Sequence, residues 1–255
     1  MGESLAYNLS TALVLGLIIG SFLNVCIHRL PRNESLITPS SRCPSCQHPV
    51  RWWDNIPVVS FLILGGRCRD CGRSISWRYP VIEFVNGIAY VLLVWRFGIG
   101  GPAFVYGVLF SALLVITFID LDHQIIPDRI TLPGMVVGLV ASAVILPIGI
   151  WDAVIGLLLG GALFYGVAVA SGGGMGGGDI KLIAMIGAFL GWKEALLTIF
   201  IGALAGSAIG LFLMAFKGKS RKYPVPFGPF LSLGAVISLF AGQAIWNWYQ
   251  HLGAF

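Results

Sequence analysis

The run Leu9–Ile27, LSTALVLGLIIGSFLNVCI, holds 19 residues and no charged side chain. A helix needs about 20 mainly apolar residues to cross a bilayer, and its backbone amides are then satisfied within the segment. The run therefore predicts a transmembrane helix. Similar runs predict helices near Val81–Phe97, Ala103–Ile119, Ile130–Ile148, Asp152–Ala170, Ile180–Leu190, Ala195–Phe216 and Phe230–Tyr249. We expect an all-α polytopic membrane protein with about eight transmembrane helices, although the sixth run is short for a span.

The composition agrees with a membrane protein and excludes an ordinary soluble domain. Hydrophobic residues make up 57% of the 255 residues, charged residues only 11%, and the mean hydropathy is +0.87. A soluble domain carries about 25% charged residues, because it must present a hydrated surface. The short alternating segments of an outer-membrane barrel are not visible in the sequence. The spanning elements should therefore be helices.

The basic residues gather in two polar loops, and this pattern predicts the orientation. Lys and Arg beside membrane segments usually mark the cytoplasmic side, so we expect the N-terminus outside and both basic loops in the cytoplasm. With eight crossings, only Arg96 and Lys193 would then lie outside. Because these charges flank apolar runs, we expect no nucleic-acid partner. The first run, preceded by Glu3 and no basic residue, should be a retained helix and no cleaved signal. The loops contain Arg29, Arg32, Arg42, Arg51, Arg67, Arg69, Arg73 and Arg78, and then Lys217, Lys219, Arg221 and Lys222.

The first polar loop, residues 28–80, carries two C-x-x-C pairs, Cys43–Cys46 and Cys68–Cys71. Each pair can place two thiolates on one tight turn, and two such knuckles make the tetrahedral four-sulfur site that Zn²⁺ prefers. We therefore expect a small cytoplasmic zinc-ribbon-like insertion with a structural zinc, and a positive φ at Gly72. Two disulfides or unconnected thiols are the alternatives, although disulfides are disfavoured in the cytoplasm. His48 is a possible substitute ligand, whereas Cys26 should be a small packed residue within its helix.

Two aspartates, Asp120 and Asp179, follow or precede apolar runs at helix ends that should face the cytoplasm. A carboxylate beside hydrocarbon is costly and therefore suggests function. Two carboxyl groups held close together cannot both ionise easily, so they share a proton. The ionised group can then take a proton from water while the other polarises a scissile carbonyl. This pattern indicates aspartyl proteolysis at the membrane surface.

Simpler roles for the same acids also have to be considered. Asp179 could only cap the helix that begins near Ile180, with Lys181 reaching to the membrane interface. Asp128 follows Pro127 and is expected to begin or cap the next helix. Asp122 is either a solvated interfacial charge or an accessory to Asp120.

Four groups of residues together resemble the bacterial type IV prepilin peptidases, also called leader peptidase/N-methyltransferases. The two cysteine pairs match that family's cytoplasmic zinc loop. The other three groups are Gly20-Ser21-Phe22-Leu23-Asn24-Val25 with Ile27, Arg29, Leu30 and Pro31; Arg78-Tyr79-Pro80 with Glu83; and the aspartate motifs Asp120-Leu121-Asp122 to Ile126-Pro127-Asp128 and Gly174-Met175-Gly176-Gly177-Gly178-Asp179-Ile180-Lys181.

The resemblance implies an eight-helix inner-membrane GxGD protease. Such an enzyme would remove the basic leader of type IV prepilins or type II secretion pseudopilins at the cytoplasmic face. It would then methylate the new N-terminal amine with S-adenosylmethionine. By position, Asp120 and Asp179 would be catalytic, with Asp122 as the fallback for Asp120. Asn24, Arg29 and Glu83 are functional candidates by resemblance only, and no S-adenosylmethionine fingerprint is visible.

The expected organisation has three parts: a first transmembrane helix at residues 1–27, a zinc-binding loop associated with methyltransferase activity at 28–80, and a protease bundle at 81–255. Three other functions remain open. A zinc-anchored scaffold would not need the aspartates, and a protease without methyltransferase activity would not need the cysteine loop. A proton-coupled transporter would leave both the loop and the Gly-Gly-Asp motif unexplained.

Overall fold

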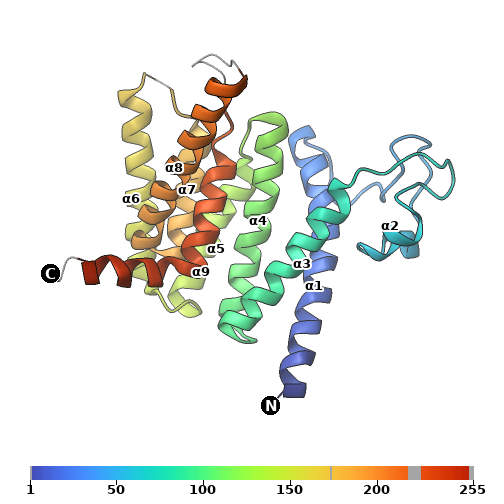
Figure 1. The fold of residues 1–255 in the computed structure, drawn as a ribbon, viewed down its shortest axis with the longest axis horizontal. Coiled ribbons are helices and arrows are strands. Elements are labelled where there is room, and N and C mark those ends of the chain that lie inside the picture. Colours follow the sequence, from blue (N-terminus) through green and yellow to red (C-terminus); the bar gives the residue numbers. More distant parts are fainter. Residues whose placement is uncertain (1, 173, 218–224, 253–255) are drawn as a thin grey trace. The chain divides into compact units, whose positions relative to one another are not determined.

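A computed structural model describes residues 2–172, 174–217 and 225–252 (Figure 1). These residues form helices and no strand, which confirms the predicted all-α class. The basic residues Lys219, Arg221 and Lys222 of the second loop lie outside the described residues. The long helices are α1 (Gly2–Arg29), α3 (Arg78–Phe97), α4 (Gly101–His123), α5 (Asp128–Val144), α6 (Gly149–Ala170), α7 (Gly177–Leu190), α8 (Trp192–Lys217) and α9 (Gly228–Leu252).

Six of the described helices are long and apolar enough to cross a membrane, namely α1, α3, α4, α6, α8 and α9. The helices α5 and α7 have only 17 and 14 residues. The predicted number of eight crossings is therefore not confirmed. The end of α5 also differs from the prediction, since the helix stops at Val144 and not at Ile148. Pro147 explains the early stop, because a proline disfavours helical geometry in the residue before it.

The chain divides into two compact units, Met1–Val115 and Ile116–Phe255, with the division inside α4. Unit 1 contains α1, α3, the loop between them and the first part of α4. Unit 2 contains the last two turns of α4 and all later helices. The boundaries that we predict for the cysteine loop, residues 28 and 80, stay a prediction.

In unit 1, α1 and α3 lie side by side with their backbones in close contact (Figure 1). A Cβ atom on Gly16 would come within 2.8 Å of the Gly87 Cα atom, and one on Gly20 within 2.7 Å of the Glu83 Cα atom. The Asn86 amide donates to the Gly16 carbonyl at 2.7 Å and accepts from the Ser111 hydroxyl at 3.0 Å. Small residues and satisfied amides of this kind hold helices together in an apolar medium.

The loop between α1 and α3 contains only short elements, η1 (Leu30–Arg32), η2 (Trp52–Asn55) and α2 (Val59–Ile63). Its ribbon is reduced to two isolated β-bridges, Arg42 with Pro49 and Arg67 with Ser74. Each bridge closes the chain around one cysteine pair. The expected ribbon-like geometry is thus present locally, without extended strands in the described residues.

Helix α7 forms the centre of unit 2. Every residue from Leu182 to Leu190 is buried, and α5, α6, α8 and α9 all contact this helix. The closest approach between backbones is that of α6 and α7, where a Cβ atom on Gly187 would lie 2.3 Å from the Gly156 carbonyl carbon. At about 1.5 Å per residue, α7 is only about 21 Å long. Four other helices contact α7 and hold it in place. Its first turn, which carries Asp179, therefore has a fixed position at one end of the unit 2 bundle.

Candidate active site

Asp120 lies in the last turn of α4 with only 5% of its surface exposed. Its Oδ2 atom accepts a hydrogen bond of 2.9 Å from the backbone N–H of Gly228, the first residue of α9. A Cβ atom at position 228 would lie 2.8 Å from that same oxygen. Glycine is therefore needed here to let the backbone approach the carboxylate. The free N–H groups and the dipole at the start of α9 stabilise negative charge on Asp120.

Asp179 is the third residue of α7, and Gly176 is the N-cap of that helix. Its carboxylate interacts with the backbone N–H of Gly176, as an acidic residue at this position of a helix often does. The Oδ1 atom is buried, and no hydrogen-bond partner is found for it among the described residues. The capping interaction therefore explains only part of the hydrogen-bonding capacity of the Asp179 carboxylate. The buried Oδ1 atom can still interact with a bound molecule.

The structure brings Asp120 and Asp179 together at one end of unit 2. The charge of Asp120 acts directly on Asp179. Ile126, from the segment between α4 and α5, packs against both Gly178, beside Asp179, and Gly228, which binds Asp120. The glycine before Asp179 and the glycine that begins α9 thus let one isoleucine fill the space between the two segments. Two carboxyl groups in this relation can share a proton and activate a water molecule.

The neighbouring acids have different surroundings. Asp122 is exposed, whereas Asp120 is buried. Asp128 begins α5, as predicted, and both of its oxygens accept hydrogen bonds of 2.7 Å from the Lys181 ammonium. This exposed ion pair connects the first residue of α5 to the second turn of α7. Lys181 therefore has an acidic partner of its own, and its reach to the membrane interface stays a prediction.

Two contributors to this site, Gly228 and Ile126, are not predicted as site residues by the sequence. Ile126 belongs to the Ile-Ile-Pro-Asp segment of the first aspartate motif. Its place in that motif is the feature of the sequence that could have identified it as a site residue. Gly228 stands in Pro-Phe-Gly-Pro, far along the chain from both aspartates. No local pattern indicates that its N–H group faces a carboxylate.

The four cysteines of the loop gather in unit 1. Their Sγ atoms all lie within 4.8 Å of one another, and those of Cys43 and Cys71 are 3.8 Å apart. Zinc–sulfur bonds of about 2.3 Å in a tetrahedron place sulfur atoms about 3.8 Å apart, so the cluster can hold one such ion. None of the five cysteines, all within the described residues, forms a disulfide, and Cys26 is buried as predicted. His48 contributes its backbone carbonyl, which accepts from the Cys43 N–H.

The two knuckles have the same backbone geometry. Gln47 donates to the Cys43 carbonyl at 2.9 Å, and Gly72 donates to the Cys68 carbonyl at the same distance. Both donors have a positive φ, 58° for Gln47 and 68° for Gly72, which confirms the expectation for Gly72. The backbone N–H groups of Cys46 and Ser45 lower the pKa of the Cys43 thiol to about 6. These N–H groups thus favour the Cys43 thiolate, which is the form that binds a metal.

A salt bridge ties the second knuckle to η2. Arg69, between Cys68 and Cys71, donates from Nη2 to Asp54 Oδ1 at 2.7 Å and from Nε at 3.0 Å. This hydrogen bonding lowers the pKa of the Asp54 carboxyl. The bidentate geometry fixes the direction of the guanidinium group and therefore the orientation of the turn.

Of the three candidates suggested by resemblance, Asn24 connects α1 to α3, whereas Arg29 and Glu83 connect these helices to the loop. The Asn24 amide donates to the Tyr79 carbonyl at 3.2 Å. The Arg29 guanidinium donates to the carbonyls of Ser35 and Pro39 at 2.8 and 2.7 Å. Glu83 Oε2 accepts from the Val58 N–H at 2.7 Å, and a second bond comes from Ser21. Each of these side chains has a structural role.

These features define a polytopic membrane protein with paired carboxyl groups at helix ends and a separate four-cysteine cluster. Two family models match the chain: the Bacterial Peptidase A24 N-terminal domain over residues 14–97, and the Type IV leader peptidase family over residues 107–211. The chain belongs to the type IV leader peptidase family, which confirms the resemblance seen in its motifs.

Curated relatives extend this similarity over nearly the whole chain. A protein of Pseudomonas aeruginosa named prepilin leader peptidase/N-methyltransferase is 36% identical, covering 98% of this chain and 96% of the relative. Proteins with the same name are 37% identical in Stutzerimonas stutzeri, over 92% of this chain and 91% of the relative, and 39% identical in Myxococcus xanthus, over 81% and 63%. No solved structure matches the chain.

Proposed function

We propose that this protein cleaves the leader of type IV prepilins and methylates the N-terminal amine that cleavage exposes. The relatives named above carry both activities in their name and align with the chain over nearly its full length. The observation that carries the proteolytic half is the pair formed by the buried Asp120 and the half-buried Asp179, whose buried Oδ1 atom has no partner among the described residues.

In the proposed cleavage step, the two carboxyl groups act as base and acid. The N–H of Gly228 favours the charged form of Asp120, so Asp120 takes a proton from the attacking water. Asp179 carries the shared proton and hydrogen-bonds the oxygen of the scissile carbonyl. The tetrahedral intermediate then collapses with protonation of the leaving amine. This mechanism requires neither a covalent intermediate nor a metal at the aspartates.

The four cysteines Cys43, Cys46, Cys68 and Cys71 are proposed to hold a structural zinc ion, since four thiolates leave no open position for water. S-adenosylmethionine, when bound, would supply an electrophilic methyl group for the second activity. The cysteine loop would then be the part associated with methylation.

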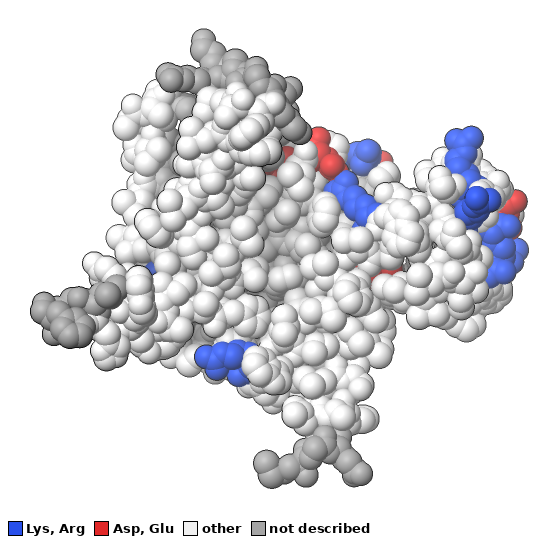
Figure 2. Space-filling model, in the orientation of Figure 1, with Lys and Arg blue, Asp and Glu red and all other residues white. Residues whose placement is uncertain are grey.

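We place the protein in the inner membrane with its active site toward the cytoplasm. The basic loop supports this orientation, because Lys and Arg concentrate on the cytoplasmic side. Figure 2 shows Lys and Arg gathered on the cysteine loop, while the visible helical surfaces carry few charges. Acidic side chains around the site, Asp122 and Asp128 among them, would attract a basic leader. Prepilins and type II secretion pseudopilins are the proposed substrates, and no nucleic acid is expected.

The test is cleavage of a prepilin with a basic leader in membranes that contain wild type, Asp120→Asn or Asp179→Asn. Mass spectrometry reports both leader removal and the added methyl group. Each variant should lose at least about 100-fold in cleavage rate, as expected for removal of an acid or base. Asp152→Asn, in the first turn of α6, is the matched control and should cleave normally. Normal processing by both dyad variants would reject the protease and favour the scaffold.

A further inference from the structure

A cavity of about 650 Å³, which we call the polar cavity for its charged and amide side chains, lies in unit 1 between the cysteine loop and the facing ends of α1 and α3. Its lining carries both signs of charge, namely Glu34, Asp54, Asp70 and Glu83 together with Arg29, Arg42, Arg69 and Arg73. Amide side chains and the rings of Phe61 and Tyr79 also line it. The volume is in the range of sites for cofactor-sized ligands, about 300–1,000 Å³.

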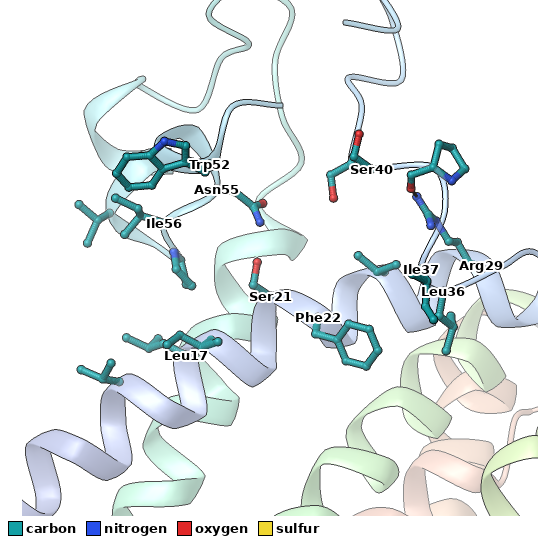
Figure 3. A pocket seen from close by; sticks show the side chains of 17 residues that line it. Leu17, Ser21, Phe22, Arg29, Leu36, Ile37, Ser40, Trp52, Asn55 and Ile56 are labelled. Carbon is teal, nitrogen blue, oxygen red and sulfur yellow. Dashed lines mark hydrogen bonds between the residues drawn. The ribbon is translucent and has the colours of Figure 1, made fainter. Parts of the chain in front are cut away.

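An apolar groove of about 630 Å³ adjoins this cavity (Figure 3). Leu17 and Phe22 of α1 form one wall, and Trp52 and Ile56 of the loop face them across the groove. The residues Ser21, Val25, Arg29, Pro39, Ser40, Ser41 and Asn55 line both spaces. The cavity and the groove therefore meet along a shared, mostly polar boundary.

We propose that unit 1 contains the methyl-transfer site, with the methyl donor in the polar cavity and the apolar N-terminal segment of the processed substrate in the groove. This proposal rests on the proposed methyltransferase function. It assigns that function to residues of α1, α3 and the cysteine loop, apart from the aspartates of unit 2.

The cavity suits a zwitterionic sulfonium nucleoside. Such a donor has two positive groups, one carboxylate and one flat heterocycle, which call for charges of both signs and an aromatic surface. Glu83 is only 8% exposed and lines the cavity. Its carboxylate receives hydrogen bonds from the Val58 N–H and Ser21, but two oxygens offer about four acceptor sites. It therefore keeps the capacity to hold one cationic group of a ligand.

The groove suits the start of an apolar peptide for two reasons. It runs along the outward face of α1, a candidate membrane span, where Val14 and Ile18 are exposed. A substrate helix that lies in the bilayer can reach this face by lateral movement. The groove also ends at the polar boundary with the cavity, so an amine at the end of an apolar segment would meet the donor there.

The transfer balances without a further reactant. The neutral N-terminal amine attacks the methyl carbon, so that an N–C bond forms while the C–S⁺ bond breaks. Sulfur keeps the electron pair and becomes a neutral thioether, and the methylated ammonium releases one proton to water. An α-amino group has a pKa near 8, so a useful fraction is neutral at physiological pH.

Photolabelling tests the cavity directly. Purified Asp179→Asn protein, which we expect not to process substrate, is irradiated with radiolabelled S-adenosylmethionine, and the labelled peptide is identified by mass spectrometry. The label should map between residues 21 and 83, on residues such as Asn55, Phe61 or Tyr79. A label confined to residues 116–255 would overturn the proposal.

Equilibrium binding of S-adenosylhomocysteine tests the role of Glu83. Glu83→Gln should weaken binding by about tenfold or more, as for loss of a charged hydrogen bond. Leader cleavage and zinc content should stay at wild-type levels. Because Glu83 also receives the Val58 N–H, Asn55→Ala is a second variant that leaves this bond intact and should also weaken binding. Wild-type affinity in both variants would reject the cavity as the donor site.

A bulky substitution tests the groove. Ile18→Trp should raise the KM for methylation of a processed pilin peptide several-fold and leave S-adenosylhomocysteine binding unchanged. Leu15→Trp is the matched control, since Leu15 is also exposed on α1 but does not line the groove. Equal kinetics for the two variants would mean that the groove holds lipid and no substrate. If the wild-type protein neither cleaves nor methylates, the proposed function itself is rejected.

Discussion

At the scale of single residues, the candidate protease site depends on backbone groups as much as on carboxyl groups. Asp120 is held by the N–H of Gly228, and Asp179 by the N–H of Gly176. Both donors belong to helix N-termini, where free N–H groups and the helix dipole favour negative charge. A site built in this way needs no basic side chain beside its acids, and can remain open to a basic leader.

Gly228→Ala tests the requirement for close approach. The added methyl group would meet Asp120 Oδ2 at 2.8 Å and must displace either the carboxylate or the start of α9. A shift of this kind can reduce the rate of catalysis by about 100-fold, so cleavage should fall strongly while the protein still inserts. Gly166→Ala in α6, where nothing lies within 4 Å, is the control. Equal cleavage rates in the two variants would show that Gly228 does not position Asp120.

At the scale of elements, α7 is held by small residues on its neighbours. Gly134 and Gly138 of α5 face Met185 and Phe189, and Gly156 of α6 faces Gly187. Ser142 adds a hydrogen bond of 2.9 Å to the Ala188 carbonyl. Because the Gly156–Gly187 contact is between backbones and the α5 glycines contact side chains of α7 closely, any shift of α7 along its axis would disturb this packing and would also move Asp179. The packing of the buried helix therefore positions the catalytic candidate at its start.

Gly187→Ala should destabilise unit 2 by about 1–3 kcal/mol, the usual cost of overpacking. The added carbon would overlap the Gly156 backbone at 2.3 Å, and a backbone cannot rotate away as a side chain can. Thermal unfolding in detergent measures the effect. Gly166→Ala should instead leave stability unchanged or raise it by up to about 1 kcal/mol, through helix propensity. A Gly187→Ala protein as stable as wild type would mean that α6 and α7 are less tightly packed than the 2.3 Å distance indicates.

At the scale of the whole molecule, two groups of functional candidates occupy two compact units. The cysteine cluster and the adjoining polar cavity belong to unit 1, whereas Asp120, Asp179 and Gly228 belong to unit 2. The two family models divide the chain in a similar way, with matches on residues 14–97 and 107–211. The two proposed activities should therefore be separable by mutation.

Cys43→Ser combined with Cys68→Ser should release the metal and reduce methylation far more than cleavage. Cys43 and Cys68 line the cavity in unit 1, whereas the aspartate pair belongs to unit 2. Metal content by mass spectrometry and the two activities, measured on one preparation, provide the test. Parallel loss of both activities would indicate general misfolding. Rapid inhibition of cleavage by a chelator, before the loop unfolds, would argue for a catalytic metal.

The sequence by itself determined the helical membrane class, the two cysteine knuckles and the positions of the two aspartates. These features depend on local properties: the length of apolar runs, the spacing of thiols and the turn preference of glycine. The expected end of α5 was wrong by four residues, because the apolar run continues to Ile148 whereas Pro147 ends the helix at Val144.

Only the tertiary structure decided which distant groups meet. The Gly228 N–H faces Asp120 across 108 positions of sequence, and Ile126 packs on glycines from two other segments. Glu83 also makes a contact that is distant in sequence, since its carboxylate accepts a hydrogen bond from the Val58 N–H at the edge of the polar cavity. Such contacts arise from backbone groups, which every residue except proline carries alike, so no pattern of side chains in one sequence can identify them. Their positions follow from helix packing, which depends on the whole of each unit.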